Sequence, residues 1–223
     1  LSRIGEAAAR VGRSAEDVTL VAVGKTFPAD EIRRLHGLGH LDFGENKVQE
    51  LVGKADELAD LSDVRWHMIG HLQRNKVKEV VGRVHLFHAL DSARLARKLH
   101  GRLDMDNEEM DCLVQVNVSG EDSKYGVPPD QLEVLLDGVQ RFDRLRLRGL
   151  MTLAAPAQDP EDVRHEFASM RELAERVRNR LNIGGKGPIL SMGMSNDFEV
   201  AIEEGATHVR IGSAIFGPRN YDG

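Results

Sequence analysis

The sequence is poor in the residues that mark several common classes of protein. Its only cysteine, Cys112, has no partner for a disulfide within the chain and lies in an apolar run, as a buried thiol does. Aromatic residues make up 4% of the 223 residues, which argues against a surface that stacks nucleic-acid bases. Neither a signal sequence nor a run of about 18 apolar residues is present. We therefore expect a protein of the reducing cytoplasm with no membrane partner.

No charge of one sign dominates the sequence either. The 30 Lys and Arg residues and the 36 Asp and Glu residues give a net charge of −6, with both signs interspersed along the chain. Because a nucleic-acid-binding protein concentrates basic residues in a stripe or patch, we expect no nucleic-acid partner. A chain of this length that is 41% hydrophobic can bury one sizeable core. No linker-like stretch divides it, so we expect residues 1–223 to form a single domain.

Eight short apolar runs alternate with helical patterns along the chain. Runs such as Val18–Val23 are nearly continuous, which is typical of strands buried on both faces of a parallel sheet. The clearest helical pattern begins at Asp159 and Pro160 and carries an apolar stripe as far as Leu181. The expected strands are Val18–Val23, Leu41–Phe43, Arg65–Ile69, Val84–Ala89, Cys112–Val118, Leu145–Leu150, Ile189–Met192 and Thr207–Ile211.

Eight strand–helix units in 223 residues are the count of a compact (β/α)8 barrel. We therefore predict an α/β fold, a single TIM-type barrel with an extra N-terminal helix over Ile4–Val11. The alternative is a doubly wound open sheet, which would carry a glycine-rich fingerprint after its first strand. Gly24-Lys25-Thr26 stands there instead, so the sequence favours the barrel.

The last two expected strands are each followed by a turn that contains glycine and serine. Gly193 and Ser195 follow one strand, with Ser195 in the expected N-cap position of a helix, and Gly212 and Ser213 follow the other. Such turns present backbone N–H groups and hydroxyls to an anion. In TIM-type barrels, phosphate is frequently bound by the loops after strands seven and eight. The pair of turns therefore predicts a phosphate site, although either turn alone could be an ordinary βα connection.

Closure of the barrel makes the eighth strand a neighbour of the first. Lys25, which follows the first strand, and Arg210, on the eighth, would then lie side by side near the two turns. A lysine beside an arginine can have a lowered pKa, which suits it to form a Schiff base with an aldehyde. A phosphorylated aldehyde is then the expected ligand, and pyridoxal 5′-phosphate (PLP) is the commonest of these. The alternative for Lys25 is an ordinary solvated lysine at a strand end.

Six ordered segments also carry a resemblance to a known family. They are VAVGKT around Lys25, FGENKVQE at 43–50, WHMIGHLQRNK at 66–76, QVNVSGEDSKYG at 115–126, RGLMTL at 148–153 and SMGMSNDFEVAIEEGATHVRIGSAIFG at 191–217. Through them the chain resembles, over nearly its whole length, the YggS/PROSC family of pyridoxal phosphate homeostasis proteins. That family shares its barrel with the N-terminal domain of bacterial alanine racemases.

The resemblance implies a role for each matching residue. Lys25 matches the family lysine that forms the Schiff base with PLP, and Arg210 matches the arginine that faces the pyridine nitrogen. Ser195, Gly212 and Ser213 match the residues that bind the phosphate.

The resemblance further implies residues that line the cofactor pocket and shows where this chain departs from the pattern. The lining positions are Asn46, His71 and Met151. Gly24 stands where a serine is usual, Met68 replaces an aromatic residue and Tyr125 replaces a small residue. These departures lie beside the motifs, and none removes an expected contact.

The same features favour a carrier of PLP over an enzyme. An arginine opposite the pyridine nitrogen favours the unprotonated ring, which weakens the electron sink that carbanion chemistry needs. A racemase also needs a second acid–base group, which alanine-racemase-like enzymes take from a C-terminal β-domain, and we expect no such domain here. We expect a monomer without catalytic residues that stores, shields or delivers PLP, with PLP-dependent apo-enzymes as acceptors. The alternative is a PLP-dependent amino-acid racemase or lyase.

Two pairs of histidines raise the possibility of a metal site. His67 and His71 are four residues apart, but Gly70 and the expected strand before it argue against a zinc-binding helix. His85 and His88 are three residues apart on an expected strand, which places them on opposite faces. We therefore expect no metal.

Overall fold

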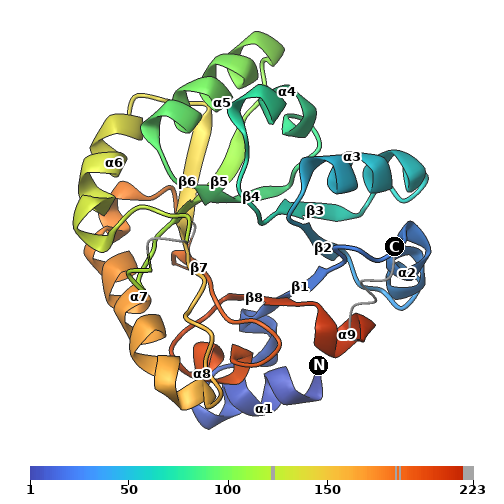
Figure 1. Ribbon diagram of the computed structural model, residues 1–223, viewed down its shortest axis with the longest axis vertical. Coiled ribbons are helices and arrows are strands. Elements are labelled where there is room, and N and C mark those ends of the chain that lie inside the picture. Colours follow the sequence, from blue (N-terminus) through green and yellow to red (C-terminus); the bar gives the residue numbers. More distant parts are fainter. Residues whose placement is uncertain (122–123, 184, 186, 218–223) are drawn as a thin grey trace.

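Eight parallel strands close into a barrel that helices surround (Figure 1). The computed structural model describes residues 1–121, 124–183, 185 and 187–217. The strands are β1 (Thr19–Val23), β2 (Asp42–Glu45), β3 (Arg65–Met68), β4 (Leu86–Leu90), β5 (Met110–Gln115), β6 (Leu145–Met151), β7 (Ile189–Ser191) and β8 (His208–Ile211). Each strand pairs with the next, and β8 returns to pair with β1, where Val21 lies opposite Arg210. The predicted barrel is confirmed, and the open sheet is wrong.

Helices follow the strands on the outside of the barrel. They are α1 (Ser2–Arg10), α2 (Ala29–His36), α3 (Val48–Glu57), α4 (Val77–Val80), α5 (Ala93–Asp106), α6 (Leu132–Val139), α7 (Arg164–Arg176), α8 (Phe198–Glu203) and α9 (Ser213–Phe216). The helix expected from Asp159 is divided: a 3-10 turn at Pro160–Val163 precedes α7, and Asp159 caps that turn by accepting from Glu161 N–H at 3.0 Å. Within the described residues, no helix has the length and apolar character needed to cross a membrane.

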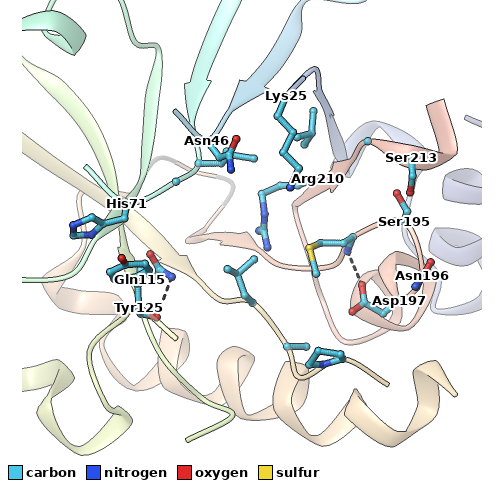
Figure 2. A pocket seen from close by; sticks show the side chains of 18 of the residues that line it. Lys25, Asn46, His71, Gln115, Tyr125, Ser195, Asn196, Asp197, Arg210 and Ser213 are labelled. Carbon is cyan, nitrogen blue, oxygen red and sulfur yellow. Dashed lines mark hydrogen bonds between the residues drawn. The ribbon is translucent and has the colours of Figure 1, made fainter. Parts of the chain in front are cut away.

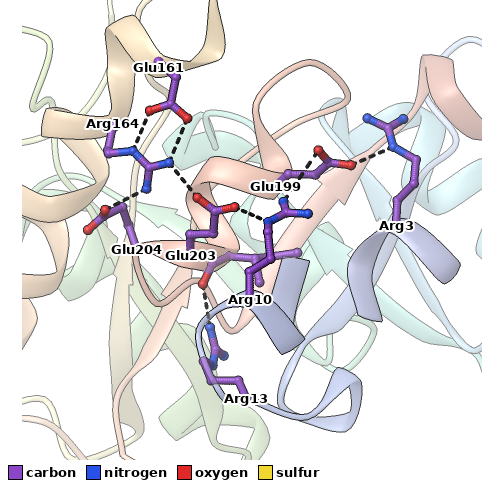
Figure 3. A network of polar contacts seen from close by, with 9 residues as sticks. Arg3, Arg10, Arg13, Glu161, Arg164, Glu199, Glu203 and Glu204 are labelled. Atoms are coloured by element: carbon purple, nitrogen blue, oxygen red, sulfur yellow. Dashed lines mark hydrogen bonds and ion pairs between the residues drawn. The ribbon is translucent and has the colours of Figure 1, made fainter. Parts of the chain in front are cut away.

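The extra N-terminal helix α1 is fixed to α8. Its buried residues Ile4, Ala7 and Ala8 form the apolar contact. Figure 3 shows the charged rim of this contact, in which Arg10 Nε lies 2.6 Å from Glu203 and Arg13 donates to the carbonyl oxygen of Ile202 at 2.9 Å. Because half-exposed ion pairs contribute little, we attribute the docking mainly to the apolar face. Helix α1 therefore supports α8, the helix that follows the first glycine–serine turn.

The strands bury polar side chains as well as apolar ones. Cys112, on β5, is fully buried, and burial raises the pKa of its thiol, so it is an inert core residue. The buried polar residues of the strands are Asp42, Glu45, His67, His88, Gln115, Ser191 and Arg210. Buried polar groups are costly unless they are hydrogen-bonded. We therefore expect these buried side chains to have hydrogen-bond partners.

Candidate functional site

A cavity of about 750 Å³ lies at the carboxyl ends of the strands (Figure 2). Its lining comes from the ends of β1, β2, β3, β5, β6, β7 and β8 and the segments that follow them, which is where TIM-type barrels bind ligands. Seven of the eight predicted binding residues line it: Lys25, Asn46, His71, Ser195, Arg210, Gly212 and Ser213. The eighth, Met151, is fully buried at the end of β6 and is not part of the lining.

Lys25 stands in a tight turn that is held through its backbone. The carbonyl oxygen of Gly24 accepts a hydrogen bond from Lys54 Nζ of α3 at 2.7 Å. On the other side of Lys25, the N–H of Thr26 donates to Glu50 Oε2 at 2.8 Å. Thr26 has a φ of 70°, a left-handed conformation that is strained for a β-branched residue. The turn is therefore fixed by α3 against its own backbone preference.

Behind this turn lies a buried ion pair. Lys54 Nζ is 2.6 Å from Glu45 Oε1, and both side chains are nearly inaccessible to solvent. Burial raises the pKa of Glu45 to about 7, although the charge of Lys54 opposes the shift. Glu45 Oε2 is buried and has no hydrogen-bond partner among the described residues. The carboxyl group is therefore poised between its charged and neutral forms near neutral pH.

Gly24 fits this arrangement closely. A Cβ at this position would lie 3.1 Å from Glu45 Oε1 and 3.2 Å from Ile32 Cδ1. Both distances are tighter than ordinary van der Waals contact. The family's serine would therefore require a small shift of Glu45 or Ile32 in this chain.

Arg210 is held in the opposite way, by its side chain. It is 3% exposed, and its guanidinium donates to Ser191 Oγ and to the carbonyl oxygen of Thr152, both at 2.7 Å. Burial lowers the pKa of Arg210 to about 10, and the charge of Asp197 partly opposes this. Arg210 therefore remains charged at neutral pH. Lys25 and Arg210 point into the same cavity, so their predicted proximity is confirmed (Figure 2).

The two glycine–serine turns adjoin. The hydroxyl of Ser195, in the turn after β7, accepts a hydrogen bond from the N–H of Ala214 after β8 at 3.4 Å. Gly193 makes the first turn possible, because it has a φ of 91° and a Cβ there would lie 2.6 Å from Ala201 Cβ. Within the described part of the chain, the backbone N–H groups of Ser195, Asn196 and Gly212 donate to no other residue. The turns thus offer a cradle of donors to an anion.

The predicted N-cap role of Ser195 is wrong. The helix α8 begins at Phe198, and Asp197 is the residue before it. Asp197 Oδ1 accepts from the N–H of Met194 at 2.6 Å, which closes a turn before the helix starts. Because Asp197 takes this place, the hydroxyl of Ser195 stays at the cavity rim.

Asn46 and His71 occupy one wall of the cavity. Gly70 allows their segments to meet, because a Cβ there would lie 2.2 Å from the carbonyl oxygen of Asn46. The side-chain oxygen of Asn46 is buried and has no hydrogen-bond partner in the ranges that the structure describes. A buried acceptor of this kind at a cavity requires a donor from a ligand or from water.

Tyr125 and His71 form the mouth of the cavity (Figure 2). Their rings are stacked, with centroids 4.3 Å apart and an interplanar angle of 12°. His71 Nδ1 also lies 3.2 Å from Asp91 Oδ2. Tyr125, which replaces the small residue usual in the family, therefore stacks on His71, a residue that lines the cavity.

Some lining and supporting residues were missed by the sequence reasoning. Asn196 and Gln115 line the cavity, and Ser191 holds Arg210 from behind. All three stand inside segments that carried the resemblance, so their place in those segments was the available signal. The expectation that His85 and His88 lie on opposite faces of one strand is wrong, because His85 precedes β4 and both rings lie close to that of His67, with centroids 5.6 and 5.2 Å away. Among the described residues, no three or more His, Cys, Asp or Glu side chains are arranged to hold a metal ion.

Comparison with known proteins agrees with this architecture. Residues 1–220 match the family described as alanine racemase, N-terminal domain. The chain is 44% identical to the pyridoxal phosphate homeostasis protein of Aquifex aeolicus, over 99% of this chain and 96% of that protein. It is 39% identical to the human protein of the same name, over 98% of this chain and 84% of that one.

Solved structures agree as well. PipY of Synechococcus elongatus with PLP bound is 33% identical and has a TM-score of 0.83, over 96% of this chain and 100% of that one. A D-threo-3-hydroxyaspartate dehydratase from Delftia, 19% identical with a TM-score of 0.67 over 96% of this chain and 58% of that one, shares the fold alone.

The fold and the cavity define a barrel of the alanine racemase N-terminal type. Within that class, the chain belongs to the family of pyridoxal phosphate homeostasis proteins.

Proposed function

We propose that this protein binds PLP through Lys25 and acts in PLP homeostasis, by storing, shielding or delivering the cofactor without turning over amino acids. One observation carries the proposal: a lysine, a buried arginine and two donor-rich turns converge on one cavity. The family supports it, and so does the relative PipY, whose structure contains PLP. The cavity volume of about 750 Å³ lies within the range of cofactor sites.

The residues of the cavity fit the chemical groups of PLP. When bound, the cofactor supplies an aldehyde, with which Lys25 Nζ would form a Schiff base. Ser195, Gly212 and Ser213 would hold the phosphate, because their hydroxyls and backbone N–H groups are donors. The buried side-chain oxygen of Asn46 would accept from a ligand donor. In this assignment Met151 packs behind the site, and His71 closes the mouth.

Arg210 would determine what the site does with the cofactor. A guanidinium only donates hydrogen bonds, so beside the pyridine nitrogen it would keep that nitrogen an unprotonated acceptor. An unprotonated ring is a poor electron sink, and carbanion chemistry is then unfavourable. Binding without turnover is the outcome that this geometry supports.

A racemase or lyase is the second candidate, and one observation favours it. His71 contacts Asp91, and both His71 and Tyr125 lie at the cavity, where an acid–base group would be needed. Incubation of the PLP-loaded protein with single amino acids, followed by assay for D-isomers and keto acids, separates the two candidates. Turnover well above that of free PLP would contradict the carrier proposal.

The remaining elements of the proposal concern the setting of the protein. We infer that residues 1–223 act as one PLP-binding unit, as a monomer in the cytoplasm. PLP-dependent apo-enzymes would be the acceptors of the cofactor. Transfer to such an enzyme, followed as recovered activity in a mixture with the loaded protein, is the direct measurement.

The lysine assignment is tested by trapping. Borohydride reduction followed by mass spectrometry should place the PLP adduct on Lys25, and Lys25→Ala should lose both the adduct and the visible absorbance. Lys76→Ala is the matched control, because Lys76 lines the same cavity. An adduct retained in Lys25→Ala would refute the assignment.

A further inference from the structure

A continuous hydrogen-bonded path crosses the interior of the barrel and ends at Arg210. Its members come from five strands: Asp42 on β2, His67 on β3, His88 on β4, Ser191 on β7 and Arg210 on β8. None is more than 7% exposed. Strands β4 and β7 are not neighbours in the barrel, so the contact between His88 and Ser191 spans its lumen.

Each link of this path has the length of a hydrogen bond. Asp42 Oδ1 is 3.0 Å from His67 Nε2, and His67 Nδ1 is 2.9 Å from His88 Nε2. His88 Nδ1 is 2.8 Å from Ser191 Oγ. The same Oγ lies 2.7 Å from Nη1 of Arg210.

With Asp42 ionised and both imidazoles neutral, one arrangement of protons satisfies every link. The carboxylate of Asp42 only accepts, so His67 carries its proton on Nε2 and its Nδ1 accepts from Nε2 of His88. Nδ1 of His88 is then unprotonated and accepts from the hydroxyl of Ser191, whose oxygen accepts from Arg210. Every donor therefore points away from Arg210.

The surroundings of the path favour this arrangement. Burial lowers the pKa of His67 and of His88. Burial tends to raise the pKa of Asp42, but hydrogen bonds from His67 and Arg65 hold it well below its usual range. The other titratable groups that face the two imidazoles are His85 and His208.

An added proton would change this arrangement. A second proton on His67 would place N–H groups on both sides of its link to His88, unless the proton of His88 moved to Nδ1 and Ser191 Oγ accepted from it. The polarity of the path therefore depends on both imidazoles staying neutral.

We propose that His67, His88 and Ser191 are positioning residues that hold the guanidinium of Arg210 in one orientation toward the cavity. The second anchor is the carbonyl oxygen of Thr152, which accepts from Nη2 at 2.7 Å. With both anchors made, the guanidinium cannot rotate without losing a buried hydrogen bond. Both anchors of Arg210 are neutral, and the carboxylate whose charge acts on it, Asp197, lines the same cavity.

The consequence for the ligand rests on the proposed function. A guanidinium fixed in this way would meet the pyridine ring of PLP as an oriented donor, so loosening it should weaken binding. The orientation of the protons, in contrast, is a property of the protein alone. The arrangement of the protons and the effect on PLP binding can therefore be tested and refuted separately.

The first measurement is ¹⁵N NMR of the histidine side chains in the protein without PLP. We expect His67 and His88 to be neutral at pH 7, with the proton on Nε2 and an unprotonated Nδ1. Signals are assigned by the loss of each in His67→Gln and His88→Gln. A proton on Nδ1 of either ring at pH 7 would overturn the path, whether or not PLP binds.

The second measurement is the dissociation constant of PLP, together with the Nε–H signal of Arg210. Ser191→Ala removes a buried hydrogen bond to the charged Arg210 and should raise the dissociation constant about tenfold. His88→Leu removes the group that orients the Ser191 hydroxyl and should change the dissociation constant in the same direction. Both variants should broaden or shift the Arg210 signal. His88→Gln keeps one donor and one acceptor and should recover most of the affinity. His85→Leu is the control, because its ring is exposed and 5.6 Å from that of His67 but makes no link in the path.

The outcomes separate the two proposals. Normal PLP affinity and an unchanged Arg210 signal in His88→Leu and Ser191→Ala would overturn the positioning role, while PLP binding itself stands. Failure of the unaltered protein to bind PLP would refute the proposed function, and the Arg210 signal in the same variants would still decide whether the path orients the guanidinium. Equal losses in His85→Leu would show a general packing effect and would overturn the specific role.

Discussion

Lys25 and Arg210 bring positive charge to the same cavity, but the barrel supports them by opposite means. Arg210 is held by its side chain, through neutral groups that cross the lumen. The turn of Lys25 is held by its backbone, from the helix layer outside the barrel, where Lys54 of α3 binds Gly24. One support is a directional path without a charge next to the arginine, and the other is a buried ion pair.

The difference shows how one site can combine a rigid and an adjustable cation. The path behind Arg210 has a single arrangement of protons as long as both of its imidazoles are neutral. The pair behind Lys25 depends on Glu45, whose pKa is raised to about 7, so its charge state varies near neutral pH. In the proposed function, a lysine that binds and releases an aldehyde would use such freedom in its proton balance, whereas an arginine that orients a ring would not.

Removal of Lys54 should give the largest effect on stability. Lys54→Met leaves the carboxylate of Glu45 buried without its partner, and we expect a loss of about 3–5 kcal/mol in the free energy of unfolding at pH 8. Urea unfolding measures this. The loss should be smaller at pH 5.5, where Glu45 can take up a proton.

Lys47→Met is the control for that variant. Lys47 is exposed and lies 3.6 Å from Glu50, so its removal should cost less than about 1 kcal/mol. Equal losses in the two variants would contradict the buried pair as the main support of the turn.

The two supports should respond to pH with opposite signs. The pKa of Glu45 is raised from 4.5 to about 7, so its contribution is present below pH 4.5 and is lost as pH rises through 7. Burial lowers the pKa of His67 and of His88 from 6.5, so their contributions are present above pH 6.5 and are lost as pH falls.

The Glu45 contribution can be isolated in Glu45→Gln. The difference in unfolding free energy between this variant and the unaltered protein should shift in favour of Gln by about 2–3 kcal/mol between pH 4.5 and 8. Urea titrations across that range provide the comparison. Parallel pH profiles for the two proteins would rule out a raised pKa at Glu45.

The strain in the Lys25 turn should produce a smaller effect. Thr26 is exposed and has a φ of 70°, so Thr26→Gly should raise the free energy of unfolding by about 0.5–1 kcal/mol, because relief of strain outweighs the added entropy of the unfolded chain. Thr19→Gly, in the regular strand β1, should destabilise instead. A loss of stability in Thr26→Gly would mean that the Thr26 side chain stabilises the fold by more than the strained backbone destabilises it.

The smallest effect concerns Gly24. Gly24→Ala brings a methyl group 3.1 Å from Glu45 Oε1 and should cost no more than about 1 kcal/mol, because a shift of a few tenths of an ångström relieves the contact. Gly53→Ala in α3 is the counterpart: its Cβ would meet nothing within 4 Å, and it should stabilise by about 0.5–1 kcal/mol. Thermal unfolding of both variants gives the comparison, and a gain in Gly24→Ala would contradict the crowding.

The sequence predicted the barrel well because its signal is local and repeated. Each expected strand overlaps an observed one, since near-continuous apolar runs between helical patterns leave few alternatives. The errors lie at the ends of elements. Ser195 and Asp197 are both residues that favour a helix start, but α8 begins after Asp197, whose carboxylate accepts from the N–H of Met194 rather than from the helix. Likewise, Asp159 initiates a 3-10 turn before the regular helix.

The residues of the candidate site also divide into those that local sequence features predict and those that depend on the tertiary structure. Lys25, Arg210 and the glycine–serine turns could be found from the sequence, because strand ends and turn residues are local features and closure brings them together. Met151 shows the limit: a residue at the end of a strand can point to the cavity or into the core, and its sequence position does not say which. The stacking of Tyr125 on His71 depends on the path of a loop, which no periodicity encodes.

By itself the sequence determined the strand count, the closure that joins Lys25 to Arg210 and the donor-rich turns opposite them. Only the tertiary structure decided which residues support Lys25 and Arg210. His88 and Ser191 are 103 residues apart and lie on strands that are not neighbours, so only the closed lumen brings them within 2.8 Å. Hydrogen bonds across a barrel are set by its curvature and side-chain directions, and neither leaves a periodic trace in the chain.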